Sequence, residues 1–582
     1  MVSQVNFQMW RNNPAKFWKI AAWLMPTIGL GLIWVATRIW GVLPKILGDE
    51  LIYSTNARHL ALADSSVPNY LFNLVFGMTN TCGYGFYTCG KVINMLFLVG
   101  FAVFIYLAAR LLVEPGMALF VGFLALVGPI SAYASYFTPD MMFYFGASIV
   151  IYSALRTSDG TALGRWALIG LGLGLVTLIK PHALFMIPPI LAYVVFLGIK
   201  AGKAAVGKSV LSALIFGAAV FATKFAIGFM FAGPKGLSIF GGSYDSSAAG
   251  VIGGDNAAKD WVIPTEVQPL VSGGAVSATI WQVLFHISYL VIFFGIPAIY
   301  VIIKAAKAAK KGAVLTTDTR IAAFLFAAVA TLVAVSAVFV SVSGSFGEIL
   351  QNRVMVRYYE YLVPFLPLAV LIGFKQAKDV GKVARWVTVG VVAVWLGVSL
   401  PYLSTLVPGM FTDSSLMAAA LKSGISLWVF GALSFGVIVY WAMQPLKGDK
   451  AWLYGVAPAV VLLYAISSYA NMTVMSSIVG PYTTASRFAH DNLNEEQRSK
   501  LIVIGNAIQN VQAAQLWIDT PGATGKAVAE GSTVDINEYP EETKYLLIVG
   551  NVTISGDGFL LKQADNWALV QNATPEDAAK AK

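Results

Sequence analysis

The sequence predicts a polytopic α-helical membrane protein of about thirteen transmembrane helices, followed by a small α+β domain at the C-terminus. The chain is 57% hydrophobic and only 12% charged, about half the charged fraction of an average soluble domain. Mean hydropathy is +0.71, and apolar runs of 18 or more residues recur, as in helices that cross a bilayer. Residues 474–582 are polar and contain only short apolar runs, which indicates a separate soluble domain.

Thirteen apolar segments are candidate spans. The first is too long for the apolar core of a cleaved signal peptide and has no small-residue cleavage site after it, so we expect a signal anchor. The segments cover residues 17–42, 91–113, 117–137, 139–155, 163–181, 183–200, 205–232, 277–303, 320–344, 358–375, 385–406, 424–443 and 451–473.

The loops between these segments predict the orientation. With the N-terminus in the cytoplasm, twenty of the 39 Lys and Arg residues fall in inside segments, as the positive-inside rule requires. We therefore assign the net charge of +10 to membrane orientation and expect no nucleic-acid partner. Residues 1–473 then form the membrane domain with outer loops 43–90 and 233–276, and the C-terminal domain lies on the outer side.

Apolar runs typical of strands mark the C-terminal domain. They are "KLIVIGN", "KYLLIVGN" and "GFLLKQADNWALV", and the stretch "NAIQNVQAAQLWID" between the first two is predicted to be helical. The expected fold is a small α+β domain, and it lacks the glycines of a dinucleotide-binding motif.

Two adjacent acids follow the first span, in "GDELIYSTNARHLA". We expect this stretch to form a short interfacial helix with Asp49, Tyr53 and Asn56 on one side. Acids beside a bilayer are unfavourable unless they are paired or hydrated, so Asp49 and Glu50 need an explanation. Asp49 is either a functional carboxylate or only the N-cap of the helix.

Two further ionisable residues lie at outer span ends. Asp140, in "TPDMMFYF", is either a second functional acid or part of a helix start capped by Thr138. Lys180, in "IKPHALFMIPP", is either functional or a lysine that snorkels to the headgroups. His182 follows it, and a lone histidine is more often structural than catalytic.

A pair of arginines precedes the tenth span, in "NRVMVRYYEYLVPFLPL". Arg353 and Arg357 share a face if the segment is helical. Two cations on the outer side oppose the positive-inside trend, which favours an anionic ligand such as a lipid phosphate. The alternative is headgroup anchoring together with Tyr358 and its neighbouring tyrosines.

The cysteines and the metal ligands are sparse. Cys82 and Cys89, seven residues apart in an outer loop, are either a disulfide or two free thiols. Their spacing fits no zinc pattern, and no cluster of metal ligands is evident, so we do not predict a cofactor, and a divalent metal stays open without support from the sequence.

Together these outer-face residues suit a reaction that deprotonates a hydroxyl and expels a phosphate. A carboxylate can serve as general base, and cations can stabilise the charge of the leaving phosphate.

The order of these motifs resembles the GT-C fold glycosyltransferases, especially the ArnT-like and protein O-mannosyltransferase-like group. The resemblance rests on "GDELIYSTNARHLA", "TPDMMFYF", "IKPHALFMIPP" and "RYYEYLVPFLPL", which match its acidic first outer loop, its second acid, its "KGP-AL-LP" segment and its late "RY--P--P" segment. The glycine of the third motif is absent, since Pro181 directly follows Lys180. The motifs cover about residues 15–375, and the layout covers the whole chain.

The resemblance implies an enzyme that moves a monosaccharide from a polyprenyl-phosphate donor to a hydroxyl of a glycan, a lipid A-like lipid or a protein, with inversion. Asp49 would be the general base and Asp140 a second acid. The donor phosphate would be held by Lys180, Arg353 and Arg357, and the supporting residues would be Glu50, Tyr53, His182 and Tyr358. The expected location is a bacterial inner membrane.

Two other functions remain open from the sequence. An O-antigen polymerase or ligase also has large outer loops, but it depends on Arg and His in them instead of on an acid after the first span. An ion-coupled transporter would place its acids near the bilayer midplane and often shows two related halves. Here the acids map to outer span ends, and no internal repeat is evident.

Overall fold

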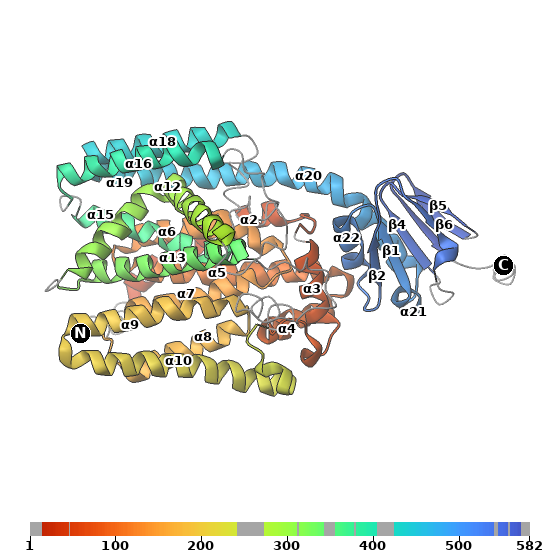
Figure 1. Cartoon of the computed structure of the whole chain (residues 1–582), viewed down its shortest axis with the longest axis horizontal. Helices are drawn as coiled ribbons and strands as arrows, with labels where there is room; N and C mark the ends of the chain where they lie inside the picture. Colours follow the sequence, from red (N-terminus) through yellow and green to blue (C-terminus); the bar gives the residue numbers. More distant parts are fainter. Residues whose placement is uncertain are drawn as a thin grey trace.

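The computed structural model describes residues 14–45, 47–240, 273–310, 314–342, 356–376, 380–403, 424–539, 545–556 and 559–571. It consists of a bundle of long helices with a β-sheet region at one end of the bundle (Figure 1). The predicted outer loop 233–276 lies largely outside the described residues.

Most of the described helices follow the predicted apolar segments, and three short ones lie in the predicted loops between them. Those described are α2 (Pro14–Ile39), α3 (Leu47–Arg58), α4 (Tyr70–Gly77), α5 (Phe86–Ala109), α6 (Pro115–Val127), α7 (Asp140–Arg156), α8 (Leu163–Thr177), α9 (Ile187–Ala201), α10 (Lys203–Ala232), α12 (Gly273–Ala309), α13 (Thr317–Val342), α15 (Pro367–Gln376), α16 (Lys382–Leu403), α18 (Gly424–Met443), α19 (Pro445–Ala451) and α20 (Ala457–Asn492). Short 3-10 segments join them, namely η1 (Leu62–Asp64), η2 (Met78–Gly85), η3 (Pro129–Ser135), η4 (Pro181–Met186), η5 (Gly233–Leu237), η7 (Val356–Tyr358) and η8 (Glu360–Phe365), and the π-helical turn η10 (Trp452–Val456) lies between α19 and α20.

Seven of the described helices are long and apolar enough to cross a membrane, and an eighth is added if the bent pair α6–η3 crosses as one span. The chain is therefore a polytopic helical membrane protein, as predicted. Other predicted spans are shorter helices, such as α8 with 15 residues. At 1.5 Å per residue, such a helix covers about 23 Å, less than the roughly 30 Å of a bilayer core.

The bend between α6 and η3 has a local cause. The two helices meet at an angle of 46°, and Gly128 and Pro129 lie at the junction. A Cβ atom on Gly128 would come within 2.5 Å of the Leu124 carbonyl oxygen, so only glycine permits this close turn. The nitrogen of Pro129 carries no hydrogen and cannot continue the ladder of helical hydrogen bonds. This bend brings η3 back into the centre of the bundle, where its residues from Ile130 to Ser135 are buried.

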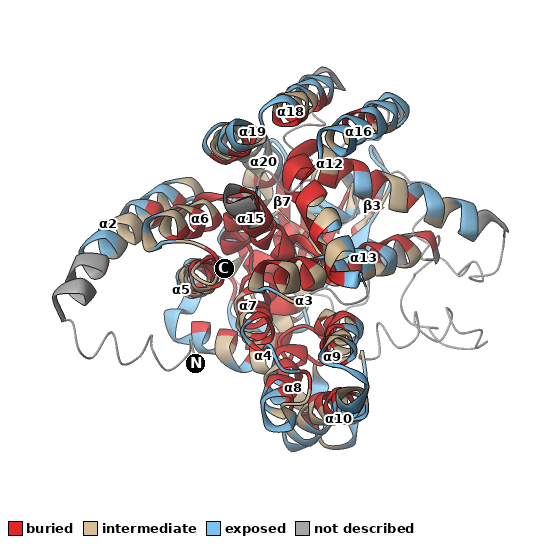
Figure 2. Ribbon diagram, turned by 90° about the vertical axis from the view of Figure 1, so that its left-hand side faces the viewer, coloured by how far each residue is buried: buried red, intermediate tan, exposed pale blue. Residues whose placement is uncertain are grey.

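Residues on the inner faces of the helices are buried, and the exposed outer faces carry many apolar side chains. Figure 2 shows buried residues on the inner faces of the helices and exposed residues on the outer faces. Exposed side chains on those faces include Leu96, Leu214 and Val394, as expected where lipid replaces water. At the end remote from the sheet, Lys200 donates a hydrogen bond to the Lys310 carbonyl oxygen at 2.6 Å. Two of the lysine-rich loops predicted to lie inside therefore meet at one end of the bundle.

The C-terminal region (residues 493–571) contains a mixed sheet, which confirms the predicted α+β class. Its elements are α21 (Glu495–Ser499), β1 (Leu501–Gly505), α22 (Ile508–Ile518), β2 (Thr524–Ala527), β3 (Thr533–Asp535), η11 (Ile536–Glu538), β4 (Tyr545–Val549), β5 (Thr553–Ser555), β6 (Phe559–Ala564) and β7 (Trp567–Gln571). The five-stranded sheet has the order β2-β1-β4-β7-β6, with β1 parallel to β2 and β4, and β7 antiparallel to β4 and β6. A separate parallel pair joins β3 and β5. The inner strands β1 and β4 are almost wholly apolar and buried, as is usual for parallel strands covered on both faces.

Helix α20 connects the bundle to the C-terminal region. Its 36 residues give a length of about 54 Å, and it extends from the bundle to the sheet (Figure 1). The predicted domain boundary at residue 474 lies inside this helix, and the first strand begins only at Leu501. Helix α22 lies between the sheet and α3, so α3 is covered by the bundle on one side and by the C-terminal region on the other.

Candidate active site

Helix α3 presents the acidic pair at the end of the bundle that faces the C-terminal region. The helix begins at Leu47, so Asp49 and Glu50 lie inside its first turn, where negative charge interacts favourably with the helix dipole. Asp49 is not the residue that caps this helix. The predicted short helix is thus present, with its acids in the first turn.

A continuous chain of ion pairs joins four of the predicted site residues. Arg357, in η7, donates from Nη1 to Asp49 Oδ2 at 2.8 Å. It also donates from Nη2 and Nε to the two carboxylate oxygens of Asp140, at 2.7 and 3.2 Å. Lys180 Nζ donates to Asp140 Oδ1 at 2.6 Å. The two carboxylates and two cations balance in charge, and they come from α3, α7, η7 and the residue before η4.

Solvent reaches only one end of this chain. The side chain of Asp140 is fully buried, while those of Lys180 and Arg357 are 6% and 12% exposed. The Asp49 side chain is 42% exposed. Among the described residues its second oxygen, Oδ1, accepts no hydrogen bond. Asp49 is therefore the member of the cluster that a substrate can approach.

These contacts correct two of the structural alternatives. Lys180 does not snorkel toward headgroups, because its ammonium points inward to Asp140. Thr138 does not cap α7: the N-cap position is Pro139, and no side-chain cap bond is formed. Asp140 is the first residue of α7 and binds both neighbouring cations through its carboxylate.

Glu50 points away from Asp49 into the bundle and is fully buried. Its carboxylate accepts hydrogen bonds from the Lys45 backbone at 2.8 Å, the Tyr87 hydroxyl at 2.7 Å and the Phe137 backbone at 2.9 Å. Three donors on one buried carboxylate make it a structural anchor for the start of α3. Burial lowers the pKa of Lys45 to about 8, although the nearby Glu50 carboxylate acts in the opposite direction.

The other predicted site residues differ in what they contact. Tyr53 is buried and packs edge-on against Phe72, with ring centroids 5.7 Å apart. The His182 ring stacks on the Tyr358 ring, with centroids 4.9 Å apart. His182 follows Lys180 by two residues, and Tyr358 follows Arg357 directly. Arg353 lies outside the described residues.

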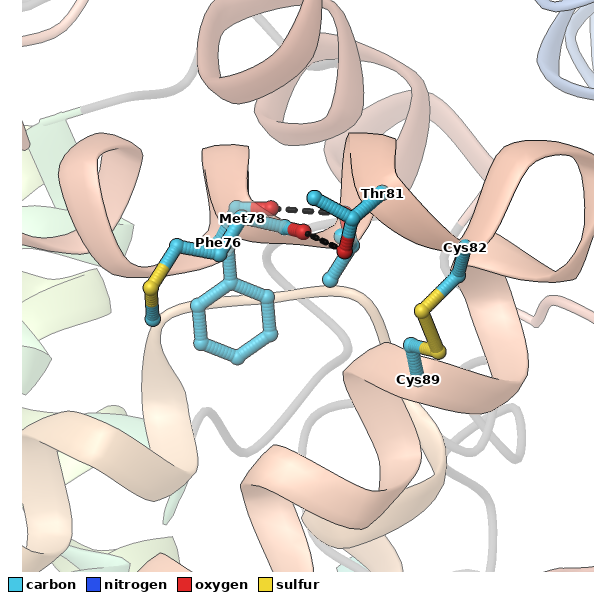
Figure 3. The surroundings of a disulfide bond; sticks show 6 residues. Phe76, Met78, Thr81, Cys82 and Cys89 are labelled. Atoms are coloured by element: carbon cyan, nitrogen blue, oxygen red, sulfur yellow. Dashed lines mark hydrogen bonds between the residues drawn. A yellow bond between two sulfur atoms is a disulfide. The ribbon is translucent and has the colours of Figure 1, made fainter.

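The structure joins Cys82 and Cys89 in a disulfide. It links η2 to the first turn of α5 (Figure 3). In the same loop, the Thr81 hydroxyl donates to the Met78 carbonyl oxygen at 2.8 Å. The disulfide closes a loop that contacts α3 and the C-terminal region, where the Tyr84 hydroxyl donates to the Trp517 carbonyl oxygen.

Two buried contacts near the cluster were not predicted from the sequence, although Glu360 was noted there as an ionisable residue inside a span. Tyr133 donates to Glu360 at 2.5 Å inside the bundle, and Glu360 lies three residues after Arg357. Arg58, at the end of α3, binds Asp519 of the C-terminal region. The signal for Arg58 was present in the sequence, because it is a cation in an outer loop. Its partner lies 461 residues away, and no local pattern points to it.

A metal site is not formed by the described residues: no group of three or more His, Cys, Asp or Glu side chains in them is placed to hold an ion.

Comparison with known proteins relates the chain to one enzyme family. Residues 69–226 match the family described as dolichyl-phosphate-mannose-protein mannosyltransferase. This segment runs from α4 into α10 and includes Asp140, Lys180 and His182. No curated protein matches the sequence.

Solved structures of an archaeal oligosaccharyltransferase are similar over much of the chain. AglB from Archaeoglobus fulgidus, in complex with an inhibitory peptide and a dolichol-phosphate, is 11% identical with a TM-score of 0.40, covering 90% of this chain and 69% of that one. The Archaeoglobus fulgidus oligosaccharyltransferase tethered to an acceptor peptide is 9% identical with the same TM-score and coverage. The family match confirms the resemblance expected from the motifs: residues 69–226 of this chain are similar to the dolichyl-phosphate-mannose-protein mannosyltransferase family.

Proposed function

We propose that the protein transfers a monosaccharide from a polyprenyl-phosphate donor to a hydroxyl of an envelope acceptor, with Asp49 as general base. One observation carries the assignment of the base: Asp49 is the exposed carboxylate at the end of an otherwise buried chain of ion pairs. Asp140 has no such freedom, because both of its oxygens are bound by Lys180 and Arg357. The acceptor is a glycan, a lipid A-like lipid or a protein.

The reaction is a direct displacement. Asp49 removes the proton of the acceptor hydroxyl as its oxygen attacks the anomeric carbon. The bond between that carbon and the phosphate oxygen breaks, and the polyprenyl phosphate leaves with the electron pair. Attack from the face opposite the leaving group inverts the anomeric configuration. Arg357 and Lys180, with Arg353 as a third candidate, stabilise the charge on the leaving phosphate.

The geometry suggests how the donor would enter this site. All three of the guanidinium donor atoms of Arg357 are engaged by carboxylates. Its pair of bonds to buried Asp140 is the persistent contact, while its bond to the exposed Asp49 is the one that a phosphate can replace. Donor binding would then free Asp49 as the base at the moment that the phosphate arrives. Asp140 keeps its place and holds the two cations in position.

We further propose that all thirteen predicted segments cross a bacterial inner membrane. The N-terminus would be cytoplasmic, and the cluster and the C-terminal region would lie on the outer side. The meeting of two lysine-rich loops at the opposite end of the bundle supports this orientation.

The test is Asp49→Asn in purified protein given defined polyprenyl-phosphate sugars and candidate acceptors, with products identified by mass spectrometry. We expect transfer to fall by at least about a thousandfold, in the upper part of the range typical of general bases. Donor affinity should stay the same or rise, because the carboxylate that competes for Arg357 has gone. The matched control is Asp64→Asn, in nearby η1, where the acid makes an exposed ion pair with Lys235.

Transfer that survives Asp49→Asn would contradict the proposed base and favour an enzyme of the O-antigen polymerase or ligase type. Flux of a substrate into proteoliposomes without donor consumption would favour a transporter instead.

A further inference from the structure

The C-terminal region contacts α3 along its length through helix α22. At the start of α3, a Cβ on Gly48 would lie 3.2 Å from the Gln512 side-chain amide nitrogen, which shows how closely the two helices approach. Leu47 packs there with Ala513 and with Val479 of α20. At the end of α3, Arg58 and His59 meet Asp519, the residue after α22. The two helices thus lie side by side, with contacts beside Asp49 and again at the opposite end.

Asp519 is the centre of the contact at that opposite end. Its carboxylate accepts two hydrogen bonds from the Arg58 guanidinium, the second at 2.8 Å, and Oδ1 lies 2.8 Å from His59 Nε2. The Arg58 side chain is 3% exposed, and its guanidinium also lies 3.6 Å from the centre of the Phe86 ring. A buried cation of this kind requires its carboxylate.

The backbone of Asp519 is adapted to this position. Among the described residues it is the one non-glycine residue with a positive φ, at 53°. Aspartate and asparagine adopt this left-handed conformation more readily than most residues. The turn ends α22 and directs the carboxylate toward Arg58.

A second contact leads from α22 toward the acidic pair. Trp517 packs with its ring centroid 5.5 Å from that of Tyr87, and the Tyr87 hydroxyl donates to Glu50. Glu50 is the residue that follows Asp49 in α3. The C-terminal region is therefore connected by packed side chains to Glu50, and to the neighbouring Asp49 only through α3 itself.

Helix α3 needs such support. It has only 12 residues, a length at which an isolated helix is marginally stable. The bundle covers one side through α4 and η2, and α22 covers the other.

We infer that Asp519 is a positioning residue, through which the C-terminal region holds α3 and so keeps Asp49 aligned with Arg357. This inference rests on the proposed function, because it assigns to the C-terminal region a part in aligning the proposed base. Its consequence is that the C-terminal region completes the active site without contributing a group that touches the substrate.

The experiment compares the full-length chain with Asp519→Asn. Asparagine keeps the size of the side chain and tolerates the positive φ. The change therefore removes the charge and replaces one acceptor oxygen by an NH₂ group that faces a donor. We expect kcat to fall about ten- to a hundredfold, as when a reacting group is displaced by about an ångström, while KM for the donor changes less than about twofold. Hydrogen exchange of the α3 amides should become faster. The matched control is Asp565→Asn, in the exposed turn between β6 and β7. It should change neither kcat nor the hydrogen exchange of the α3 amides.

A second variant tests the same contact from the other side. Arg58→Gln combined with Asp519→Asn removes the unpaired buried charge, so the double variant should recover part of the kcat that Asp519→Asn loses. If Asp519→Asn does not purify as a folded chain, Arg58→Gln and the double variant provide the comparison.

The results separate this inference from the proposed function. Wild-type kcat and unchanged α3 exchange in Asp519→Asn would overturn the positioning role, as would a rise in KM with kcat unchanged. Absence of transfer by the wild-type protein with every donor would refute the proposed function and, with it, the alignment role of Asp519. Faster α3 exchange in Asp519→Asn would then still show that the contact orders α3.

Discussion

The buried carboxylate Asp140 offers the sharpest test of how the ion-pair cluster is held together. Replacing it by asparagine preserves the shape of the side chain but removes one of two negative charges. Lys180 and Arg357 then share only Asp49, which is bound to Arg357 alone. The variant buries one uncompensated positive charge at the centre of the bundle end.

The size of the effect follows from burial. Removing one partner of a buried ion pair typically destabilises a protein by about 3–5 kcal/mol, because the other charge stays buried without compensation. Asp140 is fully buried and accepts three hydrogen bonds from cations. The remaining carboxylate, Asp49, is partly exposed and screened by solvent. We therefore expect Asp140→Asn to lower the free energy of unfolding by about 3 kcal/mol.

The assay is reversible unfolding in mixed micelles at pH 7, with Asp64→Asn as control. Asp64 and Lys235 form an exposed pair, with side chains 61% and 69% exposed, so the control should change stability by less than about 1 kcal/mol. Adding Lys180→Met to Asp140→Asn restores charge balance and should recover part of the loss. A loss below about 1 kcal/mol for Asp140→Asn, or a double variant less stable than the single one, would refute this account.

Three other predictions address the surroundings of α3. Replacing Cys82 and Cys89 by serine should destabilise their loop by about 2–3 kcal/mol, seen as faster proteolysis there than in the wild type under oxidising conditions. Glu50→Gln should cost about 1–3 kcal/mol, because an amide NH₂ meets a donor where a carboxylate oxygen accepted one; an unchanged unfolding midpoint would contradict the anchoring role. Burial raises the pKa of Asp519, but hydrogen bonds from His59 and Arg58 outweigh it and lower the pKa. Its contribution to docking is therefore complete above the unfolded value of about 3.9 and lost as pH falls below it, so α3 exchange measured against pH should show no loosening between pH 8 and 5.

The sequence by itself determined the class of the protein and the positions of most helices. Inside a bilayer every backbone group must find its partner within the helix, so long apolar runs leave no other structure open. The strands β1, β4, β6 and β7 were likewise predicted from apolar runs. The short strands β2, β3 and β5 were not, because they are exposed or partly exposed and exist only by pairing with neighbours.

The sequence also singled out the charged residues of the candidate site, since ionisable groups at span ends are unfavourable without a purpose. It placed four of them at one level of the membrane, but it did not predict in which direction around the bundle each side chain points. These four are Asp49, Asp140, Lys180 and Arg357. It could not predict that Asp49 is exposed while Asp140 is buried, nor that the Glu50 side chain points away from Asp49.

Only the tertiary structure decided which of these charges meet. Arg357 lies 308 residues from Asp49 and 217 from Asp140, and Asp519 lies still farther from Arg58. Hydropathy fixes the depth of a residue along the membrane normal, whereas its direction around the helix and its partner depend on how the helices pack. The physical reason is that burial and pairing of a charge are properties of the assembled bundle and not of the segment that carries it.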